Sequence, residues 1–122
     1  MKSKILMAAR LILGLFVLIF GLNKFLNFLP MLDLSPEAGA YFGALTSAKV
    51  MTLVAVVEIV SGLALITNKY GALLSIVLMS VSVNAVLFHA TLAPESIGPA
   101  LLLLILNIIA LYNYKDSYKG LL

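Results

Sequence analysis

The sequence predicts an all-α integral membrane protein, a bundle of four spanning helices with a short helix between the first two spans. Of the 122 residues, 63% are hydrophobic and only 11% are charged, and the mean hydropathy is +1.16. Soluble domains carry roughly 25% charged residues, and a soluble chain of this length buries only about two thirds of its surface. Much of this apolar content would face water, so we expect a lipid bilayer as the solvent. The length predicts a single membrane domain over residues 1–122.

Four apolar blocks carry the prediction of four spans, since a spanning helix needs about 20 mostly apolar residues. The blocks cover residues 5–29, 50–67, 71–90 and 97–113. Pro30 ends the first block, a polar turn over 68–71 separates the second from the third, and a segment containing Pro94 precedes the fourth. The first block is too long for a signal peptide and lacks a cleavage site, so we expect a retained helix.

The connection between the first two spans contains a helix-start signal. Ser35 offers an N-cap hydroxyl, Pro36 suits the first helical position, and Glu37 places an acid in the first turn. The pattern predicts a short helix over 36–46, with Tyr41, Phe42 and Leu45 on one apolar side. Such a helix would lie on the outer interface or fold over the mouth of the bundle. An N-terminal extension of the second span fits the pattern equally well.

The basic residues indicate the orientation of the bundle. Four spans place both termini on one side, and the positive-inside rule makes the more basic side cytoplasmic. We therefore expect an inner-membrane protein with cytoplasmic termini, anchored at the inner headgroups by Tyr112, Tyr114 and Tyr118. The basic residues form no continuous stripe, which excludes a nucleic-acid partner. The side with the termini carries Lys2, Lys4, Arg10, Lys69, Lys115 and Lys119, and the opposite side carries Lys24, Lys49, Asp33, Glu37 and Glu95.

Cysteine and histidine counts limit the chemistry of the chain. It has no cysteine, which excludes disulfides, thiol redox chemistry and cysteine-ligated metal sites in this chain. It has a single histidine, which excludes a metal site built from several histidines of one chain. We expect no metal site.

Glu58 is the polar residue that most needs an explanation. It lies near the middle of the second span, where an ionisable group costs roughly 2.5 to 3.5 kcal/mol, and its short side chain cannot reach the headgroups. Its helical face carries small residues, among them Gly62, which favours contact with other helices. We expect Glu58 to point into the bundle. Its candidate partners are Lys24, Asn84 and Asn107.

The first span carries a stripe of small and basic residues, because spacings of four and three residues return to one helical face. Glycines on such a face let another backbone approach closely. Arg10 is long enough to reach the cytoplasmic headgroups, and we interpret it in that way. For Lys24 both interpretations stay open, a lysine that reaches the headgroups and a lysine that meets a partner across the helix interface. The stripe comprises Arg10, Gly14, Val17, Gly21, Lys24 and Phe28.

Three further polar residues lie in the last two spans. Asn84 and Asn107 suit interhelical hydrogen bonds, which commonly have a structural role alone. His89, at the outer end of the third span, shares a stripe with Ser75 and Ser82 and could pass protons inward. Together with Lys24 and Glu58, these residues predict a polar site in the outer half of the bundle.

A pattern of residues along the chain is characteristic of a known family. It comprises Arg10, Gly14 and the run GLNKF at 21–25, then the run EIVSGLAL at 58–65, and finally His89. In this order the pattern resembles the DoxX family of small four-span membrane proteins. The resemblance implies a four-helix membrane bundle with family positions at Arg10, Lys24, Glu58 and His89. It also implies a link to quinone-coupled thiosulfate oxidation and to oxidoreductase complexes that handle sulfur or superoxide.

We expect an accessory or ligand-binding subunit for quinone-linked or other lipophilic redox chemistry. Lys24 or Asn84 would donate to an oxygen of a quinone-like head group, Glu58 and His89 would pass protons, and an oxidoreductase partner would supply electrons. Two alternatives stay open. One is a proton-coupled carrier or exporter that acts as a homo-oligomer. The other is a structural or assembly-assisting protein in which Lys24 and Glu58 fix the packing.

Overall fold

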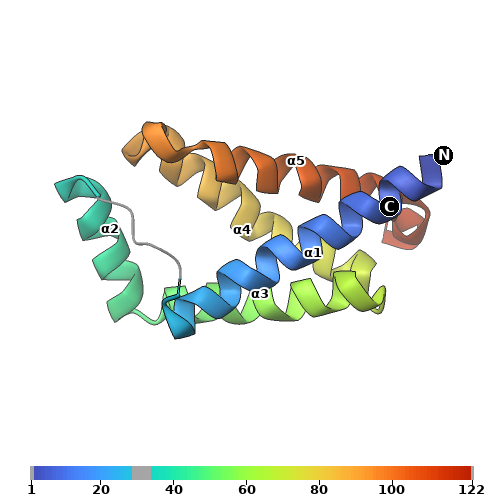
Figure 1. Ribbon diagram of the computed structural model, residues 1–122, viewed down its shortest axis with the longest axis horizontal. Helices are drawn as coiled ribbons and strands as arrows, with labels where there is room; N and C mark the ends of the chain where they lie inside the picture. Colours follow the sequence, from blue (N-terminus) through green and yellow to red (C-terminus); the bar gives the residue numbers. More distant parts are fainter. Residues whose placement is uncertain (1, 29–33, 122) are drawn as a thin grey trace.

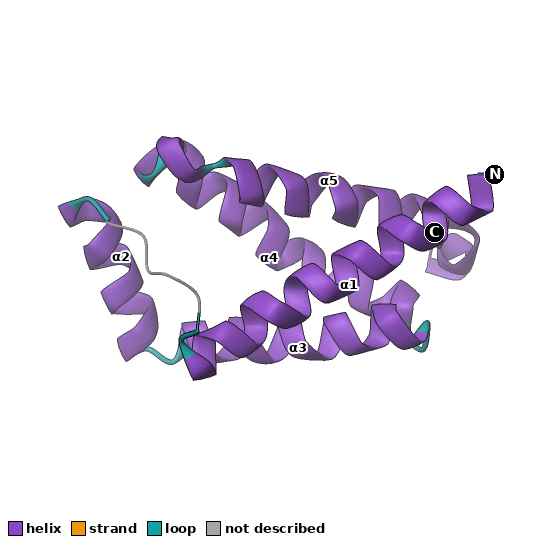
Figure 2. Cartoon of the chain, in the orientation of Figure 1, coloured by secondary structure: helices purple, strands orange, loops and turns teal. Residues whose placement is uncertain are grey.

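The regular elements of the protein are helices. The computed structural model describes residues 2–28 and 34–121, and within them no strand occurs (Figure 2). The predicted all-α fold class is confirmed. The elements are α1 (Lys2–Leu26), α2 (Pro36–Ser47), α3 (Val50–Thr67), α4 (Gly71–Leu92), the 3-10 turn η1 (Pro94–Ser96), α5 (Gly98–Asn113) and the 3-10 segment η2 (Lys115–Leu121).

The four long helices run up and down and pack in a ring. α1 contacts α3, α3 contacts α4, α4 contacts α5, and α5 closes the ring on α1. α1 and α4 therefore face each other across the diagonal. Both termini lie at one end of the bundle and α2 lies at the other (Figure 1).

The lengths of the helices fit a membrane. α1, α3 and α4 are long and apolar enough to cross a bilayer, whereas α5 is apolar but has only 16 residues. Large apolar side chains point outward, with Leu53 63% and Leu87 59% exposed. Such a surface suits lipid tails and would be unfavourable in water. Three of the four predicted blocks thus form helices long and apolar enough to span a membrane, and the fourth block forms a helix shorter than a standard span.

The boundaries of the first span differ from the prediction. α1 ends at Leu26 instead of residue 29, because Asn27 adopts a left-handed conformation (φ 51°) and its N–H bonds to Asn23 O at 2.8 Å. Asparagine tolerates this conformation and commonly ends helices in this way. Phe28 therefore lies beyond the helix, off the stripe that the sequence predicted. Residues 29 and 30, at the predicted end of the block, lie outside the described residues. α4 continues to Leu92, two residues past the predicted end.

α2 forms as the helix-start signal predicted. Ser35 Oγ accepts a hydrogen bond from Ala38 N at 3.3 Å, and Pro36 occupies the first helical position. α2 is a separate helix and not an extension of the second span, because Lys49 between them adopts a left-handed conformation (φ 65°). This turn directs α2 across the end of the bundle.

A packed core closes the half of the bundle that carries the termini. Leu13, Val17, Leu65 and Leu78 are fully buried there. Two tyrosines after α5 also stabilise this end of the bundle. Tyr114 Oη donates to Asn68 Oδ1 at 2.5 Å, and Tyr118 Oη donates to Ala72 O at 2.8 Å. These side chains hold the C-terminal segment against the α3–α4 turn.

Candidate functional site

The site is built around an ion pair between α1 and α3. Lys24 Nζ lies 2.5 Å from Glu58 Oε1, and the side chains are 22% and 5% exposed respectively. Gly21, one turn before Lys24, lets the helices approach, since a β-carbon there would lie 3.0 Å from Glu58 Cβ. A carboxylate buried in an apolar bundle needs such a partner. Of the three candidates from the sequence, the structure brings Lys24 to Glu58.

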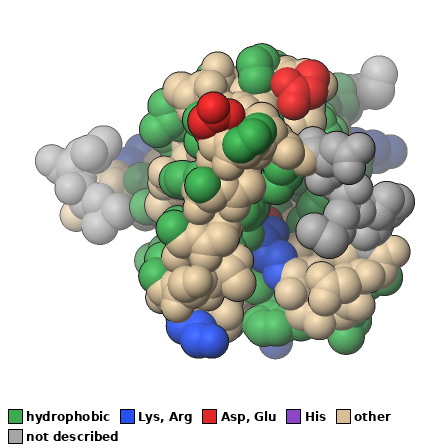
Figure 3. Space-filling model, turned by 90° about the vertical axis from the view of Figure 1, so that its left-hand side faces the viewer, with side chains coloured by type: hydrophobic (Ala, Val, Ile, Leu, Met, Phe, Trp, Pro, Cys, Tyr) green, Lys and Arg blue, Asp and Glu red, His purple; other side chains and the backbone are tan. Residues whose placement is uncertain are grey.

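The pair lies in the wall of a large cavity at the α2 end of the bundle. The cavity has a volume of about 1260 Å³ and is lined by all five α-helices. Figure 3 looks onto this end, where a basic side chain is recessed among its neighbours. The polar groups of the wall include Lys24, Glu58, Asn84 and His89, and its aromatic side chains are Phe16, Phe20, Phe25, Tyr41, Phe42 and Phe88.

The two asparagines have different surroundings. Asn84 lines the cavity, and its Nδ2 donates to Ser80 O of its own helix at 2.8 Å. Asn107 is fully buried outside the cavity wall, where Nδ2 donates to Ser75 O at 3.0 Å and Oδ1 accepts from Ser82 Oγ at 2.6 Å. Asn107 therefore joins α4 to α5, whereas Asn84 belongs to the site.

His89 lies where the cavity meets the turn after α4. Its Nδ1 is 3.0 Å from Ser96 Oγ and 3.3 Å from Ala93 O. Its ring contacts Phe88 edge-to-face, with 5.0 Å between the ring centroids. The sequence predicted His89 in the site but gave no sign of Ser96. The chain turns back at η1, and this turn brings Ser96 next to the imidazole.

An aromatic cluster lines the cavity where α2 meets α4. Tyr41 of α2 stacks on Phe88 at 5.3 Å between ring centroids, and Phe42 meets Phe88 edge-to-face at 4.8 Å. The apolar side of α2 was predicted, but its partner Phe88 was missed because one phenylalanine in an apolar span carries no distinguishing pattern.

Arg10 lies far from this site and packs against α3. Its guanidinium donates to Leu65 O, and at 3.4 Å to Ile66 O, in the last turn of α3. Unpaired carbonyl groups and the helix dipole make this end of α3 favourable for a cation. The sequence analysis interpreted Arg10 as a side chain that reaches the headgroups. In the structure Arg10 instead binds backbone carbonyl groups of α3.

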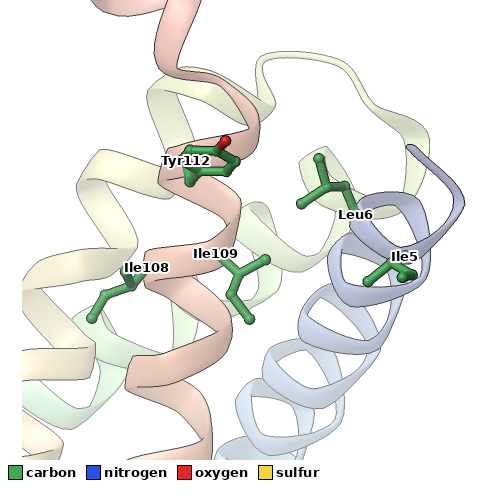
Figure 4. A pocket seen from close by; sticks show the side chains of 5 residues that line it. All are labelled: Ile5, Leu6, Ile108, Ile109 and Tyr112. Carbon is green, nitrogen blue, oxygen red and sulfur yellow. The ribbon is translucent and has the colours of Figure 1, made fainter. Parts of the chain in front are cut away.

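A second cleft lies between α1 and α5 near the termini (Figure 4). It measures about 620 Å³, and Ile5, Leu6, Ile108, Ile109 and Tyr112 line it. Its apolar wall offers no charged group for recognition.

In residues 2–28 and 34–121, no group of three or more His, Asp or Glu side chains could hold a metal ion. The α2 end is therefore the candidate functional site.

Apolar helices of spanning length around a cavity with a buried ion pair define a small integral membrane protein of the helical-bundle class. The DoxX family model matches residues 5–91, and the chain belongs to the DoxX family. The match confirms the resemblance seen in the sequence, and it includes Lys24, Glu58, Asn84 and His89. Neither the curated proteins nor the solved structures contain a significant match.

Proposed function

We propose that this DoxX-family protein binds a lipophilic molecule with a polar head group, such as a quinone, and acts as an accessory subunit in membrane redox chemistry. The observation that carries the proposal is the Lys24–Glu58 ion pair in the wall of a cavity of about 1260 Å³. Ligand sites typically measure roughly 300 to 1,000 Å³ and combine apolar walls with a few polar groups. This cavity has that composition and room for a ring with part of its tail.

The exposures of the pair suggest how a head group is held. Lys24 is the more accessible partner and has further N–H donors beyond the one directed at Glu58. Its ammonium donates to an oxygen of the head group, while Asn84 offers a second polar contact. Glu58 and His89 pass protons to and from the bound molecule. The chain has no cysteine, so electrons from thiol chemistry would come from an oxidoreductase partner.

The extent of the cavity favours a binding subunit over a carrier. Its wall reaches from the α2 end to Phe16 on α1, Glu58 on α3 and Ser80 on α4. Beyond them, the buried core around Leu13 and Leu65 separates this cavity from the cleft between α1 and α5 near the termini. A carrier would have to open this packed core in a second conformation, whereas a binding site needs one opening.

The distribution of charge supports an orientation for this site. At the end with the termini, exposed Lys4, Lys69, Lys115 and Lys119 outnumber exposed Asp116, whereas at the α2 end exposed Glu37 and Glu95 outnumber exposed Lys49. By the positive-inside rule, we place the termini in the cytoplasm of a bacterial cell and the cavity in the outer half of the inner membrane.

The proposal is tested by binding of a radiolabelled short-chain quinone to the protein in lipid nanodiscs. Lys24→Met and Asn84→Ala remove proposed donors, and we expect Lys24→Met to weaken binding about tenfold, since a hydrogen bond from a charged donor contributes roughly 1.5 to 3 kcal/mol. Asn84→Ala should weaken binding less and leave the fold intact, because the bond described for Asn84 stays within its own helix.

Matched controls are Lys69→Met and Glu37→Gln, which remove exposed charges outside the cavity wall. Both should bind like the wild type. Wild-type binding no stronger than that of Lys24→Met would contradict the proposal. If the cavity substitutions change only thermal stability, an assembly-assisting role replaces it.

A further inference from the structure

The surroundings of His89 determine which of its ring nitrogens carries the proton. Nδ1 lies 3.3 Å from the carbonyl oxygen of Ala93, a group that only accepts hydrogen bonds. A proton on Nε2 alone would direct the lone pair of Nδ1 at this oxygen, and Nδ1 could then accept only from Ser96 Oγ–H, which would give up its bond to Ala93 O. A proton on Nδ1 instead gives a bond shared between Ala93 O and Ser96 Oγ. The Nδ1–H tautomer is therefore the favoured neutral form.

Ser96 fits the same arrangement. Its Oγ donates to Ala93 O at 3.3 Å and lies 3.0 Å from Nδ1, so its lone pairs face the imidazole. The backbone N–H of Ser96 also bonds to Ala93 O, at 3.1 Å, which fixes the turn. Ser96 is a positioning residue, because it acts on His89 and does not line the cavity wall itself.

This tautomer leaves Nε2 as a hydrogen-bond acceptor. Nδ1 faces the turn at η1, and Nε2 lies across the ring, on a side chain that forms part of the cavity wall. Lys24, by contrast, can only donate. The two residues stand on α1 and α4, which face each other across the diagonal of the bundle. An Nε2 atom that faces the cavity adds an acceptor on one wall to the donor on another.

We propose that His89 Nε2 accepts a hydrogen bond from an O–H or N–H group of the bound molecule, so that the site binds the hydroxylated form of an aromatic head group, such as a hydroquinone, more tightly than a form that only accepts hydrogen bonds, such as the quinone. This inference rests on the proposed function and specifies its ligand class. An aromatic ring fits the position, because Phe88 contacts His89 and the Tyr41 and Phe42 rings are adjacent. In this class a phenol or hydroquinone binds better than its fully methylated ether.

The tautomer can be measured without a ligand. His89 is the only histidine of the chain, so ¹⁵N-histidine labelling gives the signals of one residue. At a pH where the ring is neutral, we expect the Nδ1–H pattern in the wild type and a larger share of Nε2–H in Ser96→Ala. A wild-type spectrum dominated by Nε2–H would overturn the inference, whatever binds in the cavity.

Ligand selection is measured with two probes, a 4-alkoxyphenol and its O-methyl ether with the same alkyl tail. We expect the wild type in nanodiscs to bind the phenol about fivefold to tenfold more tightly than the ether, as one hydrogen bond predicts. His89→Phe should reduce this ratio to about one while binding of the ether stays unchanged. His89→Gln, which offers an amide oxygen, should restore part of the ratio. Because the ratio is taken within each variant, it is independent of the folded fraction.

The outcomes separate this inference from the proposed function. Equal binding of phenol and ether, with both weakened by Lys24→Met, overturns the role of His89 and leaves the proposed function standing. A ratio that stays high in His89→Phe also overturns that role. If neither probe binds the wild type, the inference fails, and the proposed function fails with it when the short-chain quinone does not bind either.

Discussion

Gly14 of α1 and Gly62 of α3 are in close backbone contact. A β-carbon on Gly62 would lie 2.8 Å from the carbonyl oxygen of Gly14. This contact fixes the register of the two helices. Three turns further along α1, Lys24 then meets Glu58, and one turn before the glycine Arg10 meets the end of α3. The polar site thus depends on a close backbone contact outside it.

Gly62→Ala should destabilise the bundle. The added methyl group would also lie 2.8 Å from Leu18 Cβ, so α1 must shift, and overpacking of this kind costs about 1 to 3 kcal/mol. The free energy of unfolding in mixed micelles measures the effect. Gly39→Ala is the control, since nothing lies within 4 Å of a β-carbon there. Equal stability of the two variants would contradict the proposed packing.

Lys24→Met should cost more stability than the same change combined with Glu58→Leu. The single substitution leaves a buried carboxylate without its partner, at a cost of about 3 to 5 kcal/mol, whereas the double substitution removes both charges. Asp116→Asn, which breaks the exposed pair with Lys119, should have no measurable effect. A double variant less stable than Lys24→Met would show that Glu58 has another stabilising partner.

Phe88→Ala should loosen α2 without unfolding the bundle. It removes the ring on which Tyr41 and Phe42 pack, and aromatic pairs contribute about 0.5 to 1.5 kcal/mol each. Amide hydrogen exchange over residues 36–47 should become about tenfold faster, while exchange in α1 and α3 stays slow. Leu87→Ala, at an outward-facing neighbour, is the control. Unchanged exchange in α2 would mean that other contacts hold it.

Tyr114 should make stability depend on alkaline pH. Burial raises the pKa of Tyr114, and the positive charge of Arg10 partly opposes this rise. Above the unfolded value of about 10, the unfolded chain loses the phenolic proton while the folded protein keeps it, so the free energy of unfolding falls as the pH rises. Below that value the contribution of Tyr114 to stability is fully present.

The stability advantage of the wild type over Tyr114→Phe should therefore shrink between about pH 9 and about pH 11. Thermal unfolding across this range measures it, with Tyr70→Phe as the control because Tyr70 is 80% exposed. A constant difference between the wild type and Tyr114→Phe would contradict the role of burial.

Local patterns in the sequence determined the helices. Apolar length identified the spans, and the second was predicted at its observed bounds, 50–67. The run Ser35-Pro36-Glu37 located the start of α2 because capping is a contact between near neighbours. The end of α1 was missed, since asparagine tolerates a left-handed conformation without requiring it. The free-energy cost of placing an ionisable group in the middle of a span was enough to predict that Glu58 has a partner.

Only the tertiary structure decided which groups meet. Helical periodicity assigns a residue to a face, but it does not say which helix lies opposite or at what height. Lys24, Asn84 and Asn107 were therefore equal candidates until the Gly14–Gly62 contact set the register that brings Lys24 to Glu58. The placement of Arg10 on the α3 carbonyls, of Phe88 beneath α2 and of Ser96 beneath His89 has the same origin. Each is a contact between separate elements, fixed by how whole helices pack.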